Sequence, residues 1–174
     1  MRFNRPGLAA ISIAWLAIYA CSPTPKAATE KPAVAAPIGA LLKAAGDEAA
    51  AQCATPATPK TVGAADFDGD GVAELVVDWT EVACAKTDAD VCTPKSGCLR
   101  QVWRDNAATP TRIFQGFARD VRVETQTAGP TLVVDQAGDV CGRPDSEICR
   151  TIFRWEPRSQ SLQETAREIV AAKP

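Results

Sequence analysis

The hydrophobic pattern of the chain predicts one helix followed by a series of strands. Over residues 38–52 the apolar positions recur at intervals of three and four, which places them on one face of a helix. These positions are Ile38, Leu41, Leu42, Ala45 and Ala49. Farther along, short runs rich in Val, Ile, Phe and Trp are separated by turn residues, as is typical of strands. The runs are 74–79, 99–104, 111–117, 120–125, 131–136, 149–155 and 160–164.

Strand runs at this frequency, joined mostly by hairpins, indicate the fold class. We expect an α+β domain that is mostly antiparallel, with about six or seven strands and one N-terminal amphipathic helix. Residues 55–60 hold two prolines and are expected to connect the helix to the sheet, while 165–172 are expected to form a short closing helix. The large aromatic side chains are assigned to the core: Trp79, Trp103, Trp155, Phe114, Phe117 and Phe153.

The beginning of the chain has the pattern of an export signal. Arg2 and Arg5 precede an uncharged stretch, Gly7 to Ala20. A helix that crosses a membrane needs ~20 apolar residues, so this stretch is too short to span and fits a removable signal segment over residues 1–20. The mature protein is therefore expected to work outside the cytoplasm.

The end of this segment, Ile18-Tyr19-Ala20-Cys21, resembles the lipobox of bacterial lipoproteins, in which a small residue precedes an obligatory cysteine. The resemblance implies cleavage before Cys21 and attachment of a lipid to its thiol, although Tyr19 replaces the small residue usual at its position. Ser22 stands where many inner-membrane lipoproteins have Asp, which implies sorting to the outer membrane, facing the periplasm. The alternative is ordinary cleavage near Ala20, which would give a soluble periplasmic or secreted protein.

Composition divides the rest of the chain into a tether and a domain. Residues 21–37 are rich in Ala, Pro, Thr and Lys without a hydrophobic period, which is typical of an extended tether. Residues 38–174 then form a single domain. Without the signal, seventeen basic residues stand against twenty-one acidic ones, a net charge of −4, and the basic residues are scattered. We therefore expect no nucleic-acid partner and no membrane contact other than the lipid on Cys21.

Six cysteines remain besides Cys21, and an even number in an exported chain predicts three disulfides. They are Cys53, Cys84, Cys92, Cys98, Cys141 and Cys149. A zinc site is the competing interpretation, but the chain has no histidine and no C-x-x-C spacing.

An internal repeat narrows the choice of disulfide pairs. Leu75-Val76-Val77-Asp78 recurs as Leu132-Val133-Val134-Asp135, and in each copy a cysteine follows six residues after the Asp. The chain is thus expected to contain two similar halves, each a strand, a loop with a cysteine at both ends, and another strand. This topology predicts Cys141–Cys149 and Cys84–Cys98, which leaves Cys53–Cys92. The alternative, Cys84–Cys92, keeps the eight-residue spacing of the second half.

One motif carries recognisable chemistry. Asp66-Phe67-Asp68-Gly69-Asp70-Gly71-Val72-Ala73-Glu74 places carboxylates at its first, third, fifth and ninth positions. Calcium binds about six to eight oxygens, and the glycines permit a tight turn that points alternate Asp side chains inward. An EF-hand is excluded, because its twelfth position would be Val77, inside a β-rich run. The alternative is an acidic turn that binds no ion.

This stretch resembles the calcium loop of FG-GAP and VCBS repeats, the blades of integrin-α-like propellers. The resemblance implies a calcium ion held by Asp66, Asp68, Asp70, Glu74 and the backbone carbonyl of Val72. It covers about twelve residues of the loop and has Glu74 where the family usually has Asp. A closed propeller needs about four blades or more, and this chain has material for two. The chain also looks like small bacterial exported proteins in which one such loop precedes a disulfide-linked sheet.

No arrangement of residues indicates an enzyme. The chain has no histidine for general base catalysis, the cysteines are assigned to disulfides, and no nucleophile or phosphate-binding motif is present. We expect an envelope lipoprotein whose calcium-stabilised domain binds a protein or glycan, or has a structural role. The alternative is a small inhibitor of a hydrolase that presents the loop 85–97 or the loop 142–148.

Overall fold

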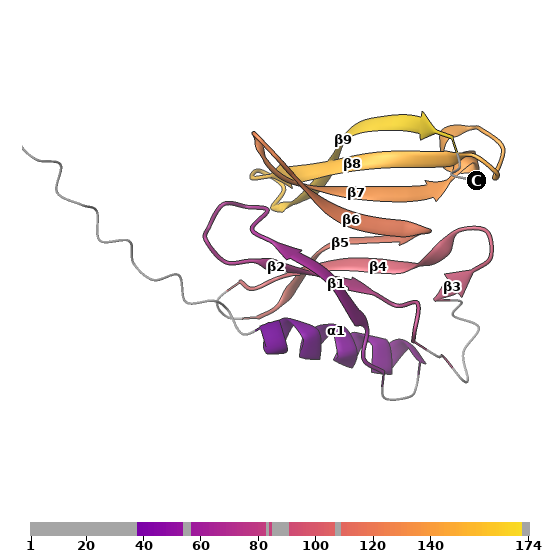
Figure 1. Ribbon diagram of the computed structural model, residues 1–174. Coiled ribbons are helices and arrows are strands. Elements are labelled where there is room, and N and C mark those ends of the chain that lie inside the picture. The colour runs from indigo at the N-terminus through magenta and orange to yellow at the C-terminus, as the bar shows by residue number, and fades with distance from the viewer. Residues whose placement is uncertain (1–37, 54–56, 83, 85–90, 107–108, 172–174) are drawn as a thin grey trace, which may run out of the picture. The chain divides into compact units, whose positions relative to one another are not determined.

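The computed structural model describes residues 38–53, 57–82, 84, 91–106 and 109–171, all within one compact unit of the chain, Pro32–Pro174 (Figure 1). In chain order its elements are α1 (Ile38–Cys53), β1 (Lys60–Ala65), β2 (Glu74–Asp78), β3 (Cys92–Thr93), β4 (Gly97–Arg104), β5 (Thr111–Ala118), β6 (Asp120–Gln126), β7 (Gly129–Ala137), the 3-10 helix η1 (Gly138–Cys141), β8 (Ile148–Glu156) and β9 (Ser161–Val170). The predicted signal segment, Cys21 and the tether lie outside the described residues.

The expected fold class, mostly antiparallel β with one helix, is confirmed. The described residues contain nine strands rather than about six or seven, and the helix begins at Ile38, well inside the chain. The additional strands are β1 and β3. Lys60, which was assigned to a connector, is the first residue of β1. The sequence of β1 has no apolar alternation, because this edge strand is largely exposed.

The strands form two antiparallel sheets (Figure 1). Sheet A has the order β1-β2-β4-β3, with β5 also paired to β4. Sheet B has the order β6-β7-β8-β9. Consecutive strands are neighbours almost throughout, as the short hairpin connections predict.

The internal repeat of the sequence is a repeat of structure. In sheet A, Leu75 lies opposite Trp103 and Asp78 lies opposite Arg100. In sheet B the residues of the second copy have the same register, with Leu132 opposite Phe153 and Asp135 opposite Arg150. Each repeated Asp forms an ion pair with the Arg that faces it. The two copies therefore have the same strand register, and each lies in a row of four strands, β1-β2-β4-β5 and β6-β7-β8-β9. The halves differ in their loops, because only Cys141–Cys149 in the second half joins the cysteines at the two ends of its loop.

Two hydrophobic cores hold three layers together: α1, sheet A and sheet B (Figure 1). Successive residues of β2 point to opposite faces. Leu75 and Val77 pack against Leu41, Ala45 and Ala49 of α1 in the first core. The next residue, Val76, belongs to the second core, between the sheets, with Val102, Ile113, Val121, Leu132, Val134 and Leu162. Both cores lie inside the compact unit, so we expect this unit to fold alone.

A buried amide ties the aromatic residues of sheet A to the helix. Gln101 is 0% exposed, and its Oε1 accepts hydrogen bonds from Nε1 of Trp79 at 3.2 Å and Nε1 of Trp103 at 3.0 Å. Its Nε2 donates to Glu48 of α1 at 2.9 Å. Buried tryptophan N–H groups need such partners. The core positions of Trp79 and Trp103 are as expected, whereas Phe117 is 37% exposed and that prediction is wrong.

The predicted closing helix at 165–172 is also wrong. Over the residues described there, the chain continues as β9, which pairs with β8 from Ser161 to Val170. The segment Ala166-Arg167-Glu168 has good intrinsic helix propensity. Pairing along the whole of β8 provides backbone hydrogen bonds that override this weak local preference.

The three disulfides are Cys53–Cys84, Cys92–Cys98 and Cys141–Cys149. The expected number and the pair Cys141–Cys149 are confirmed. The pairs Cys84–Cys98 and Cys53–Cys92, and the alternative Cys84–Cys92, are wrong. Cys92 lies in β3, directly opposite Cys98 in β4, with 3.9 Å between their Cα atoms. The end of α1 then joins the segment after β2, where Cys53 and Cys84 have Cα atoms 4.4 Å apart.

Candidate metal centre

The acidic motif forms the loop between β1 and β2, and its carboxylates organise the backbone. Asp66 accepts hydrogen bonds from the N–H groups of Gly69 at 2.7 Å and Gly71 at 2.9 Å. Asp68 accepts one from the N–H of Asp70 at 3.0 Å. Gly69 and Gly71 have φ of 78° and 87°, which residues with a side chain rarely adopt. The two glycines thus allow the chain to turn around the Asp66 carboxylate.

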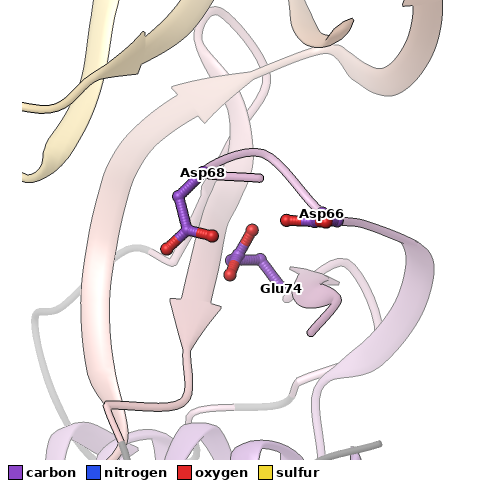
Figure 2. A group of neighbouring side chains, drawn as sticks. All are labelled: Asp66, Asp68 and Glu74. Atoms are coloured by element: carbon purple, nitrogen blue, oxygen red, sulfur yellow. The ribbon is translucent and has the colours of Figure 1, made fainter. Parts of the chain in front are cut away.

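Three of the four motif carboxylates converge. One oxygen from each of Asp66, Asp68 and Glu74 lies within 4.8 Å of the others, and Figure 2 shows these side chains close together in the loop. Glu74, the first residue of β2, is 1% exposed, and its Oε2 accepts a hydrogen bond from the N–H of Phe67 at 2.6 Å. The Asp68 side chain is 3% exposed. The site therefore places two buried carboxylates beside a third.

The charges of this group are unfavourable without a cation. The pKa of Glu74 is raised to about 7, mainly by burial and in addition by the nearby charges of Asp68, Asp70 and Asp66, while the hydrogen bond from the N–H of Phe67 acts in the opposite direction. Burial also raises the pKa of Asp68, against the lowering effects of the Asp70 hydrogen bond and of Arg104. Glu74 is thus partly protonated near neutral pH when no cation neutralises the group.

Arg104, at the end of β4, is the one cationic side chain that the described residues place against the loop. Its Nε lies 2.6 Å from Oδ2 of Asp68, and its Nη2 lies 3.8 Å from Oδ2 of Asp70. The close pair is an ionic contact without hydrogen-bond geometry, so Asp68 Oδ2 and Arg104 Nε are buried without a hydrogen-bond partner. The guanidinium also lies over the ring of Trp155 in β8, 5.0 Å from its centroid. Arg104 therefore connects the loop of sheet A to sheet B.

The structure brings together only part of the expected ligand set. Asp66, Asp68 and Glu74 form the group, while the side chain of Asp70 lies outside it; the backbone carbonyl expected from Val72 stays a prediction. The Asp70 side chain is 40% exposed, and its Oδ1 accepts a hydrogen bond from the N–H of Val72 at 2.8 Å. Sequence reasoning missed Arg104. In the register of β2 against β4, Trp103 faces Leu75. Arg104 is the next residue of β4 and Glu74 precedes Leu75, so knowledge of this register would have placed Arg104 beside the loop.

The donor set fits a hard cation. All of the converging atoms are carboxylate oxygens, the ligands that calcium and magnesium prefer. The group lacks nitrogen and sulfur donors, which soft transition metals favour. Oδ2 of Asp68, which is buried and accepts no hydrogen bond, is the kind of atom that a bound cation would satisfy.

Of the two loops considered for hydrolase inhibition, the loop 85–97 lies partly outside the described residues. The loop 142–148 is closed by Cys141–Cys149, and Arg143 contacts Glu147 within it through two hydrogen bonds of 3.1 Å. Its residues Gly142 to Ser146 are exposed.

Comparison of the chain with protein-family models, curated proteins and solved structures gives no match. The resemblance to FG-GAP and VCBS loops therefore stands on the motif residues alone. In the part of the chain that the structure describes, no helix has the length and apolar character needed to cross a membrane.

Proposed function

We propose that this chain is an envelope lipoprotein, anchored through Cys21, whose β-rich domain is stabilised by one calcium ion and acts as a structural or binding module. The convergence of Asp66, Asp68 and Glu74 in a loop that buries two of the three carboxylates carries this proposal. The lipobox resemblance and the composition of residues 21–37 support the anchor and the tether. The partner we expect is a protein or a glycan.

A bound calcium ion would remove the electrostatic cost of this loop. A divalent cation among the carboxylates becomes the largest local charge and favours the ionised form of each ligand. Glu74 and Asp68 would then be buried with an opposite charge in place of mutual repulsion. Water molecules and backbone carbonyls would supply the remaining ligands, since calcium in proteins binds about six to eight oxygens.

The position of the loop favours structural stabilisation over catalysis. The loop joins the first two strands of sheet A, and Glu74 is followed directly by the core residues Leu75 and Val76. Phe67, inside the loop, belongs to the core between the sheets. Binding of the ion is therefore coupled to formation of both cores, so that its free energy contributes to folding.

Calorimetric titration of residues 32–174 with calcium tests the proposal. We expect one site per chain and a dissociation constant between about 10⁻⁵ and 10⁻³ M, from the weakest sensor sites to extracellular modules. Asp68→Asn should weaken binding at least about tenfold, because it removes a buried ligand charge. Asp145→Asn, an exposed acid in the loop 142–148, serves as the matched control and should bind like the unmodified domain. Absence of binding heat at millimolar calcium would contradict the proposal.

A further inference from the structure

Strand β9 leaves one long edge of sheet B without a partner among the described residues. It is the last strand of that sheet, it pairs only with β8, and its residues from Gln163 to Ile169 are all exposed. A strand edge of this kind presents free backbone N–H and C=O groups that another strand can pair with. Ile169, 43% exposed, is also one of the large apolar side chains that the domain leaves in solvent.

A bulge in β9 limits what can pair with this edge. Ala166 lies opposite Ile152 and Glu164 lies opposite Phe153, so Thr165 is an extra residue in β9. Four residues of β9 lie opposite every second residue of β8, and therefore on one face of the sheet. The extra residue Thr165 makes this possible although the four are not evenly spaced in the sequence. These residues are Leu162, Glu164, Arg167 and Ile169.

In a regular strand the side chains alternate between the two faces of the sheet. Such a strand cannot match β9 along its whole length, because the extra residue, Thr165, reverses this alternation in the middle of β9. A second, antiparallel copy of β9 can, provided that the two bulges face each other. In that arrangement Glu164 faces Arg167 of the second copy, and Leu162 faces Ile169 of the second copy. Twofold symmetry repeats each contact, as it does in isologous interfaces.

We propose that the domain forms a twofold homodimer by antiparallel pairing of β9 with β9 of a second copy, which joins two sheets B into one continuous sheet. The charged pairs are complementary, an acid opposite a base. The side chain of Leu162 is already buried in the second core, so of the other pair only Ile169 is exposed. Glu164 and Arg167 are exposed to about the same extent, 39% and 41%, and already contact each other within one chain. In the dimer each of them would also form an ion pair with its oppositely charged counterpart in the second copy. The proposal does not depend on calcium.

Bulges and charged residues also protect sheet edges from pairing, which is the competing explanation. The two explanations differ in one respect. A purely protective edge repels every strand, whereas Glu164 and Arg167, on either side of Thr165, face opposite charges when a second copy pairs in the proposed register. Reversal of the charges therefore distinguishes them.

Sedimentation velocity of residues 32–174, from micromolar concentrations to about 1 mM, tests the proposal. We expect a reversible monomer–dimer equilibrium. Glu164→Arg or Arg167→Glu alone should weaken dimerisation about tenfold or more, because each creates two like-charge pairs across the twofold axis. The double variant Glu164→Arg/Arg167→Glu should restore it.

Lys43→Glu, on the exposed side of α1, is the matched charge reversal away from the edge and should leave dimerisation unchanged. Circular dichroism of each variant checks that the fold is kept. A domain that stays monomeric at every concentration would overturn the proposal. So would a dimer that the single reversals do not weaken, or one that the double reversal fails to restore.

Discussion

Replacing Glu74 by Gln separates the charge of the loop from its shape. Glutamine has nearly the size of glutamate and its amide oxygen can still accept the hydrogen bond from the N–H of Phe67. The substitution removes one ligand charge and leaves Asp66, Asp68 and Asp70 in place. Its effect on the free energy of unfolding, measured with and without calcium, is therefore a direct test of the electrostatics.

The direction follows from the pKa of Glu74, which is about 7 in the fold against an ordinary value of 4.5. Between these two pH values the folded state binds more protons than the unfolded state, so its stability falls as pH rises through the window. Each pH unit of the difference is worth about 1.4 kcal/mol, which gives a loss of about 3 kcal/mol once Glu74 is ionised. The raised pKa of Asp68 adds to this loss in the same direction.

Glutamine does not titrate, so in excess chelator Glu74→Gln should lose most of this pH dependence. We expect the variant to match the unmodified domain near pH 5 and to exceed its stability by about 2–3 kcal/mol near pH 8. Calcium should reverse the order near pH 8, since ion binding requires deprotonated ligands and the variant has lost one. Urea unfolding followed by circular dichroism measures both. Equal pH slopes for variant and parent, or a less stable variant near pH 8 in chelator, would refute the reasoning.

Three further outcomes are expected. Loss of Cys53–Cys84 by paired Ser substitutions should destabilise the domain by about 3–4 kcal/mol, more than the roughly 2 kcal/mol for Cys92–Cys98, because it closes a longer loop; peptide mapping without reduction checks the pairs themselves. Gln101→Leu should cost about 2–5 kcal/mol by leaving the N–H groups of Trp79 and Trp103 buried without an acceptor, while Gln115→Leu, on the exposed side of β5, should change urea stability by less than about 0.5 kcal/mol. Cys21→Ala should move the protein from the membrane fraction to the soluble periplasmic fraction and abolish its labelling by fatty acid; unchanged fractionation would contradict the lipid anchor.

The sequence predicts those parts of the fold that a local pattern specifies. The apolar spacing from Ile38 to Ala49 predicts α1 because one face of that helix is buried, and the apolar runs of β2 and β7 predict their strands because consecutive residues of both strands are buried. This reasoning does not apply to strands at exposed edges, which have no buried face to produce an apolar pattern. β9 has seven consecutive exposed residues, so this part of its sequence has no alternation of apolar and polar residues. It is a strand because it pairs with β8.

The candidate site shows the same division between local and distant information. Asp66, Asp68 and Glu74 are close in the chain, so their spacing alone indicates convergence. Arg104 reaches the loop only through the pairing of β2 with β4, which the sequence does not specify residue by residue. The predicted pairing of four cysteines was wrong for a related reason. The repeat treats its two halves as equivalent, whereas α1 adds Cys53 to the first half only.

The stack of Arg104 on Trp155 gives the domain an optical property. Trp79 and Trp103 lie deep in the first core with their N–H groups bonded to Gln101, so their emission is expected to stay constant when the loop changes. Trp155 is only partly buried and contacts the guanidinium that neutralises Asp68. A cation that displaces Arg104 from that carboxylate alters the charge above the Trp155 ring, while the surroundings of Trp79 and Trp103 remain as they were. The unlabelled protein would then report the occupancy of its own loop through its fluorescence.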